Sequence, residues 1–245
     1  MQAHVTIGHR IFDLKKAMDI SIPISFSDSV SAFGAATPKK NPYQVNSFIG
    51  DVGLGGSCNC HEITINPHCH GTHTECVGHI LSHVQPVPVL IKPFFGIAQL
   101  VTFEVKGISK NDLQKITLDS DVEALIIRTM PNPTNKKNQT YTDAAYMEVD
   151  AIKYCNEYGI KHLLVDFPSV DPIEDGGHLL AHRAFWHVEP GQITMSDNVA
   201  EDKSITELIY VPNEIHDGIY ALNIQISNME LDGVPSRPLL YPEIV

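Results

Sequence analysis

Basic residues are few in this sequence, and a long apolar run is missing. Its 245 residues include 17 Lys and Arg against 29 Asp and Glu, which gives a formal net charge of −12. Nucleic acids and anionic membranes attract basic surfaces, so this balance argues against both as partners. No apolar stretch approaches the roughly 20 residues that a membrane span needs, and residues 1–10 contain no apolar core of a secretion signal. We therefore expect a soluble, cytoplasmic protein whose partner is a small molecule.

Cysteine is also scarce, which excludes a disulfide-stabilised scaffold. The chain has five cysteines, and an odd number leaves at least one thiol free. Four of the five nevertheless fall between residues 58 and 76, and six of the 13 histidines lie between residues 61 and 83. These residues are Cys58, Cys60, Cys69, Cys76, His61, His68, His70, His73, His79 and His83. Because both residue types bind transition metals, the clustering indicates a metal site.

The apolar pattern predicts a mixed α/β fold with more strand than helix, in a single domain of residues 1–245. Alternation or short apolar runs mark the strands, and the best helical pattern begins at Thr142 and Asp143 and ends at Gly159. The predicted strands are residues 17–24, 61–66, 96–103, 122–129, 162–166 and 219–226. Residues 27–60 are rich in Ser, Gly, Asn and Pro, and we predict long ordered loops there.

The segment 66–79 (Asn-Pro-His-Cys-His-Gly-Thr-His-Thr-Glu-Cys-Val-Gly-His) carries most of the recognisable chemistry. On an extended backbone, side chains two residues apart point the same way, so His73 and Glu75 project together. A His-x-Glu pair close to further histidines suits zinc, manganese or iron. The alternative is a polar loop whose histidines only form hydrogen bonds.

A structural zinc site built from the cysteines is a second hypothesis for this region. Cys58 and Cys60 are separated by one residue, whereas structural zinc sites usually contain a Cys-x-x-Cys pair and four dedicated ligands. We therefore expect Cys58 and Cys60 to be buried thiols.

Segment 66–79 resembles the metal-binding signature of the cyclase family, the metal-dependent hydrolases that include bacterial kynurenine formamidase and isatin hydrolase. That signature reads His-x-Gly-Thr-His-x-Asp-x-Pro-x-His. Residues 71–73 match its Gly-Thr-His run. Glu75 takes the Asp position, Val77 the Pro position and His79 the position of the final His.

The resemblance continues along nearly the whole chain in the same order. Residues 19–23 (Asp-Ile-Ser-Ile-Pro) are similar to the family's N-terminal Asp-Leu-Ser-x-Pro strand, and residues 166–172 to its Asp-Thr-x-Ser-x-Asp-Pro turn. His182 and Glu207 resemble its later histidine and glutamate ligands. Residues 233–237 resemble the closing Gly-Ser-Pro-x-Arg motif. The joint pattern is far more specific than the histidines alone.

This resemblance implies a fold of the swivelling β/β/α type, with a central mixed, barrel-like β-sheet and few helices. It implies one or two divalent metals per chain, with His68, His73, Glu75, His182 and Glu207 as ligands and His79 as the general acid/base. Zinc is favoured, and manganese or iron remains an alternative because His and carboxylate ligands serve all three metals. A homodimer or homotetramer is implied as well.

The identity of the first ligand residue is undecided because the sequence departs from the signature. Counting back from His73, the family's first histidine falls on Cys69. Either a thiolate replaces that histidine, or a one-residue bulge brings in His68. We favour His68, since a soft thiolate would weaken the Lewis acidity of a hydrolytic metal. Glu75 in place of Asp adds one methylene, which can shift the metals.

The residue that supplies the later carboxylate ligand is undecided as well. The stretch between His182 and Glu207 is longer than in the family, and it contains Glu189 and Asp197 as competing carboxylates. Asp166 and Asp171 either support the ligands through hydrogen bonds or form turns, and we favour turns.

The activity implied by the resemblance is that of a metal-dependent amidohydrolase that cleaves a carbon–nitrogen bond, with an arylformamide as the leading substrate. A cyclic amide, as in isatin hydrolase, or a lactone is an alternative substrate for the same site. A metal-binding protein without turnover is a third hypothesis. His79 can carry a proton to a leaving nitrogen because histidine titrates near neutrality. Its alternative role is that of a fifth ligand or of a hydrogen-bond partner to a ligand.

Overall fold

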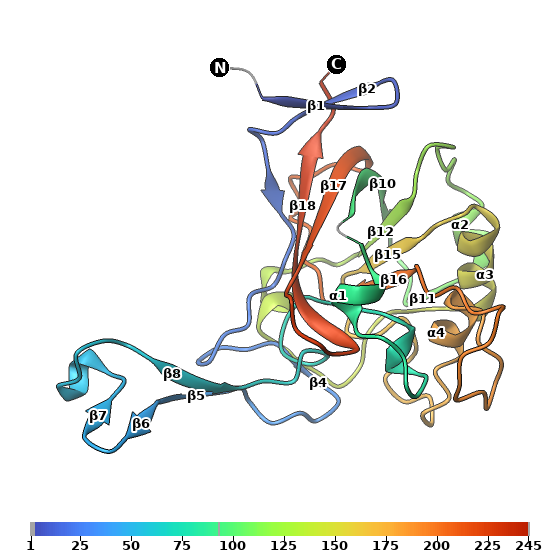
Figure 1. Cartoon of the computed structure of the whole chain (residues 1–245). Coiled ribbons are helices and arrows are strands. Elements are labelled where there is room, and N and C mark those ends of the chain that lie inside the picture. The colour runs from blue at the N-terminus through green and yellow to red at the C-terminus, as the bar shows by residue number, and fades with distance from the viewer. Residues whose placement is uncertain (1–2, 93, 245) are drawn as a thin grey trace.

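The centre of the fold is a mixed β-sheet in which seven strands close into a barrel (Figure 1). The computed structural model describes residues 3–92 and 94–244, so residues 1, 2, 93 and 245 of the predicted domain lie outside it. In spatial order the strands are β17 (Gly218–Ile226), β10 (Phe94–Phe103), β12 (Ala124–Thr129), β15 (His162–Val165), β16 (Ser204–Glu207), β9 (His73–Glu75) and β18 (Gly233–Pro242). Pairing of β17 with β18 closes the ring, and β3 (Met18–Asp19) adds to β18. The predicted barrel-like sheet is confirmed.

Strand direction explains why the barrel is mixed. Strands β10, β12, β15 and β16 run parallel, whereas β9, β17 and β18 pair antiparallel with their neighbours. Parallel strands covered on both sides read as continuous apolar runs. Every residue of β12 is buried accordingly. Ala124 and Ile126 belong to the apolar cluster inside the barrel, and Leu125 and Ile127 face the helices outside it.

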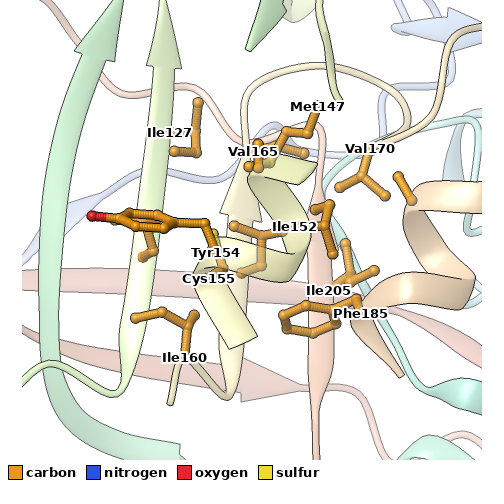
Figure 2. Packing of buried hydrophobic residues seen from close by; sticks show 14 of the residues in the cluster. Ile127, Met147, Ile152, Tyr154, Cys155, Ile160, Val165, Val170, Phe185 and Ile205 are labelled. Atoms are coloured by element: carbon orange, nitrogen blue, oxygen red, sulfur yellow. The ribbon is translucent and has the colours of Figure 1, made fainter. Parts of the chain in front are cut away.

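Helices are few, and two of them cover one side of the barrel. The helix α3 (Val149–Glu157) packs beside α4 (Leu180–Phe185), and Figure 2 shows Ile152 and Cys155 of α3 among side chains from the barrel and from α4. The helix α3 begins later than the sequence predicted because residues Tyr146–Met147 form β14, which pairs with β11 (Gly107–Ile108). Its last residue is Glu157, and Gly159, two residues further on, has the left-handed φ of +75° that the sequence predicted for the stop.

Residues 39–64 form a two-stranded ribbon that projects from the barrel (Figure 1). Its base pairs β5 (Lys39–Pro42) with β8 (His61–Thr64), and its tip carries β6 (Gln44–Val45), β7 (Phe48–Ile49) and the 3₁₀ helix η1 (Val52–Leu54). The prediction of loops is therefore wrong over this stretch. The prediction that Cys58 and Cys60 are buried is wrong too, because both are exposed on the ribbon.

The other elements are short. They are β1 (His4–Ile7), β2 (Arg10–Asp13), β4 (Ser31–Ala32), β13 (Thr140–Tyr141), α1 (Val87–Leu90), α2 (Lys110–Leu113) and the 3₁₀ helices η2 (Val77–His79) and η3 (Thr134–Lys137). Among the helices of the described residues, none combines the length and apolarity needed to cross a membrane.

Candidate metal centre

The short strand β9 lies between β16 and β18 and carries two predicted ligands, His73 and Glu75. Its register places His73 opposite Glu207 of β16, and Glu75 opposite Gly233 of β18. Both side chains on β9 are completely buried. Strand pairing thus joins a histidine and a glutamate that are far apart in the sequence.

The turn before β9 brings His68 into the same place. Thr72 anchors this turn, since its hydroxyl accepts from the Ile22 amide and donates to the Leu208 carbonyl. Gly71 is needed here because a Cβ would lie 2.9 Å from the Ile22 carbonyl oxygen. His68 then places Nδ1 3.1 Å from Oε2 of Glu75.

Helix α4 supplies a third imidazole, His182, from its first turn. Its Nδ1 lies 2.5 Å from Oδ2 of Asp171, and the same carboxylate accepts from the amides of Ala181 and His182. With Nδ1 donating to Asp171, Nε2 is left facing Oε1 of Glu75 at 2.9 Å and Oε1 of Glu207 at 3.5 Å. Asp171 therefore orients His182, which is the less favoured of the two roles that the sequence left open for it.

Several buried nitrogen and oxygen atoms converge without well-aligned hydrogen bonds. They are His68 Nδ1, His73 Nε2, His182 Nε2 and both carboxylate oxygens of Glu75. Leaving such atoms unpaired in a protein interior costs about 1–3 kcal/mol each. A divalent cation bound among them would satisfy all of these lone pairs at once.

The geometry fits such a cation. Ligand atoms of His73, Glu75 and Glu207 lie within 4.8 Å of one another, and so do those of His68, Glu75 and His79. Imidazole and carboxylate donors in this number suit zinc, manganese or iron. Glu75 belongs to both groups and could be shared by two ions, and His79 is the one member that lies outside the ligand set implied by the resemblance.

Charge interactions in the cluster perturb the pKa values of its members. Burial opposes the charged form of Glu75, yet the charges of His79 and His182 and hydrogen bonds with His182 and His68 hold its pKa well below its usual value. Burial likewise opposes the charged form of His68, but hydrogen bonds with Asp232 and Glu75 raise its pKa to about 10. Carboxylates and imidazoles of the cluster are thus strongly coupled, as at many functional sites.

His79 and Asp232 complete the cluster. His79 ends η2, and its Nδ1 lies 3.3 Å from Oδ2 of Asp232 and 3.9 Å from Oε2 of Glu75. Oδ2 of Asp232 also lies 3.1 Å from Nε2 of His68. Asp232 is absent from the residues predicted for the site, and the only signal for it in the sequence is its position directly before the 233–237 motif.

The other ligand candidates from the sequence do not join the cluster. Cys69 is buried next to the cluster but belongs to neither group of candidate ligands. His70 uses both ring nitrogens in the loop, accepting from the Asn66 amide and contacting the Ala36 carbonyl. Glu189 and Asp197 are exposed. Of the competing carboxylates, the structure brings Glu207 to the cluster.

A cavity of about 360 Å³ opens onto the cluster. Its wall includes His68, His79, His182 and Glu207 of the cluster together with Phe33, Ile173 and Leu179. A mostly apolar wall with a few convergent polar groups is typical of small-molecule sites. A larger hollow of about 830 Å³ lies between α3 and α4, but it contains none of the cluster residues.

The sequence comparisons identify the family to which this closed mixed barrel belongs. The family described as "Putative cyclase" matches residues 18–172, and the chain belongs to this cyclase family. The resemblance drawn from the sequence motifs is confirmed.

Curated relatives agree with that membership. The kynurenine formamidase of Bacillus anthracis is 27% identical over 230 residues, covering 93% of this chain and 98% of the relative. The kynurenine formamidase of Bacillus thuringiensis (strain Al Hakam) is 28% identical over 190 residues, covering 76% of this chain and 82% of the relative.

Solved structures show the same fold. A potential metal-dependent hydrolase with cyclase activity aligns with a TM-score of 0.66 at 15% identity, covering 93% of this chain and 98% of the other. Isatin hydrolase A of Labrenzia aggregata, bound to benzyl benzoate, aligns with a TM-score of 0.63 at 14% identity and covers 92% of this chain and 93% of its own.

Proposed function

We propose that this protein is a metal-dependent hydrolase that cleaves a carbon–nitrogen bond, with an arylformamide as substrate. The observation that carries the proposal is the convergence of unpaired, buried imidazole and carboxylate atoms beside a cavity. Relatives named kynurenine formamidase, which align over most of the chain, support the substrate class.

In this proposal the ligands of one or two metals are His68, His73, Glu75, His182 and Glu207, with Glu75 shared. Zinc is favoured over manganese and iron. A divalent cation held there would act as a Lewis acid toward a carbonyl oxygen and lower the pKa of water to about 7.

The chain's own residues prepare this chemistry. Asp171 fixes the ring of His182, and the Val170 amide donates to Oε1 of Glu207 at 2.8 Å. Such partners hold ligand side chains in one orientation before metal or substrate arrives. His79 borders the cavity and carries the proton that the leaving nitrogen needs.

The volume and the lining of the cavity support an arylformamide as the substrate. A volume of about 360 Å³ lies at the small end of the usual range for ligand sites. The apolar wall of Phe33, Ile173 and Leu179 would face the aryl ring, while the polar side receives the formyl group. A cyclic amide or a lactone could use the same wall and remains the alternative substrate class.

The test is turnover of purified protein on matched substrates, measured with and without added zinc. We expect hydrolysis of an N-formyl arylamine, and slower or no hydrolysis of a cyclic aryl amide and an aryl lactone. Glu75→Gln is expected to abolish turnover and lower metal content, while Glu189→Gln serves as a control outside the cluster. Metal binding without turnover on any of the three would refute the hydrolase and leave the metal-binding protein.

We also propose that the partner of the projecting ribbon is a second copy of this chain. Hydrogen bonds of the described residues 39–64 stay within the ribbon, and an isolated two-stranded ribbon is marginally stable in water. Its side chains Val52, Leu54 and Ile63 are more than half exposed. Light scattering should give a dimer or tetramer that Leu54→Ser weakens and Val89→Ser, on α1, leaves intact. A monomeric wild type would contradict this proposal.

The proposal places the enzyme in the cytoplasm. All five cysteines are free, which fits a reducing compartment. Fractionation of source cells tests this assignment.

A further inference from the structure

Asp232 enters the cluster from a chain segment that sequence motifs did not assign. It ends the connection between β17 and β18. Its carbonyl accepts from the Cys76 amide at 3.0 Å, and the Cys76 carbonyl accepts from the His79 amide at 3.0 Å. One residue, Cys76, therefore ties the backbones of Asp232 and His79 together, which fixes the distance between their side chains.

The side-chain contact selects one nitrogen of His79. Oδ2 of Asp232 lies 3.3 Å from Nδ1 of His79, closer than Oε2 of Glu75 at 3.9 Å. A carboxylate only accepts hydrogen bonds, so Nδ1 must carry the proton in this contact. In a neutral imidazole the other nitrogen, Nε2, then holds the lone pair.

The remaining surroundings of His79 leave Nε2 available. Its ring stacks on that of His68, with centroids 4.3 Å apart and planes 28° apart. Within the described chain Nε2 has no hydrogen-bond partner, and the residue borders the cavity. A ring held by a stacked neighbour and one carboxylate has little freedom to rotate.

We propose that Asp232 is the positioning residue for His79: it accepts a hydrogen bond from Nδ1 and so presents Nε2 to the substrate. This inference rests on the proposed hydrolysis. In that reaction Nε2 accepts a proton from the attacking water as the carbon–oxygen bond forms. It then returns the proton to the leaving nitrogen as the carbon–nitrogen bond breaks. Amide and water thus give acid and amine, and His79 ends in its starting state.

A competing role for Asp232 is support of His68 alone. Its Oδ2 lies 3.1 Å from Nε2 of His68, and this contact directs Nδ1 of His68 toward Glu75. Partners of metal ligands typically contribute about 10- to 100-fold to metal affinity. The two roles therefore differ in what a substitution changes: metal affinity for His68, and ring tautomer and kcat for His79.

The experiment compares wild type with Asp232→Ala, Asp232→Asn and His79→Ala. The tautomer of His79 is determined by ¹⁵N NMR of histidine-labelled protein, without metal and with zinc, and His79→Ala identifies the signal. Metal content, kcat and KM on an N-formyl arylamine are measured on the same samples. The double variant Asp232→Ala/His79→Ala completes a double-mutant cycle, which measures whether the two residues act together.

We expect wild-type His79 to carry its proton on Nδ1, and Asp232→Ala to populate the other tautomer. At full metal occupancy, kcat should fall by about 10- to 100-fold in Asp232→Ala with little change in KM, and no further in the His79→Ala background. Asp232→Asn, whose amide oxygen still accepts, should keep the tautomer and restore part of the activity.

Two results would overturn the inference. One is an unchanged His79 tautomer in Asp232→Ala. The other is a loss of activity in Asp232→Ala that is explained entirely by lost metal, or that is equally large when Asp232→Ala is added to His79→Ala. Failure of the hydrolase proposal is separable, because the NMR measurement needs no substrate: a wild type without turnover whose tautomer depends on Asp232 keeps the positioning role.

Discussion

Gly233 tests whether His68 belongs to the metal centre. A Cβ at this position would lie 2.3 Å from Cε1 and 2.5 Å from Nε2 of the His68 ring. Ordinary van der Waals contact begins at 3.4 Å, so one of the two groups must move. The backbone is fixed, because Gly233 pairs with Glu75 across β18 and β9. Gly233→Ala should therefore displace the imidazole.

The size of the effect follows from what the ring loses. Rotation takes Nδ1 of His68 away from Oε2 of Glu75, now at 3.1 Å, and Nε2 away from Asp232. Losing an outer partner of a ligand typically costs about 10- to 100-fold in metal affinity, so displacing the ligand should cost at least that much. Residual crowding should lower the free energy of unfolding by about 1–3 kcal/mol.

The assay is zinc competition with a chromophoric chelator, together with urea unfolding of the metal-free protein. Gly107→Ala, on β11, is the matched control, since its Cβ would also crowd a ring, 2.9 Å from the Tyr146 hydroxyl oxygen, but touches no residue of the cluster. In a His68→Ala background, Gly233→Ala should have no further effect on zinc affinity. Wild-type affinity in Gly233→Ala, or an equal loss in both backgrounds, would refute the assignment of His68.

Three further predictions follow from buried groups. Asp171→Ala should lower zinc affinity by about 10- to 100-fold in the same competition assay, because His182 loses the carboxylate that orients it; unchanged affinity would show that His182 is not a ligand. Burial, with the nearby charge of Lys161, lowers the pKa of His162 from 6.5 to about 4. Between these two values the unfolded chain binds a proton that the folded chain does not, so stability falls as pH drops, by about 3 kcal/mol once pH is below 4. His162→Gln should flatten the pH dependence of urea unfolding over that window, and an identical slope in the variant would contradict the reasoning. Lys136→Met should destabilise the fold by about 3–5 kcal/mol in urea unfolding, because it leaves the buried Asp166 carboxylate, 2.8 Å from the Lys136 ammonium, without its counter-charge. Adding Asp166→Asn should recover most of that loss, and a double variant as unstable as Lys136→Met would rule this explanation out.

Local patterns predicted the parts of the site that are close in sequence. The spacing of His73 and Glu75 predicted a shared side because both lie on one strand, and β9 is that strand. Apolar runs located β10, β12 and β15 to within a few residues. His182 and Glu207 came from a family resemblance, since no local rule joins residues that meet only through α4 and the β16–β9 pairing.

The residues that were missed or misassigned make their decisive contacts with residues that are far away in the sequence. Asp232 and Asp171 are isolated aspartates in turns, and turn formation is the common role of such residues. What distinguishes them is contact with a histidine elsewhere in the chain, which only the folded structure supplies. The start of α3 was misplaced for a related reason: residues 146 and 147 pair with β11, and this contact overrides a helical pattern.

The central claim is that the histidine–carboxylate cluster holds a divalent metal. Elemental analysis by plasma mass spectrometry, on untagged protein purified without added metal or chelator, tests it most directly. We expect about one to two equivalents of zinc, manganese or iron per chain in the wild type. The metal content of Glu75→Ala should be markedly lower. Less than about a tenth of an equivalent, with no gain in thermal stability when zinc is added, would contradict it.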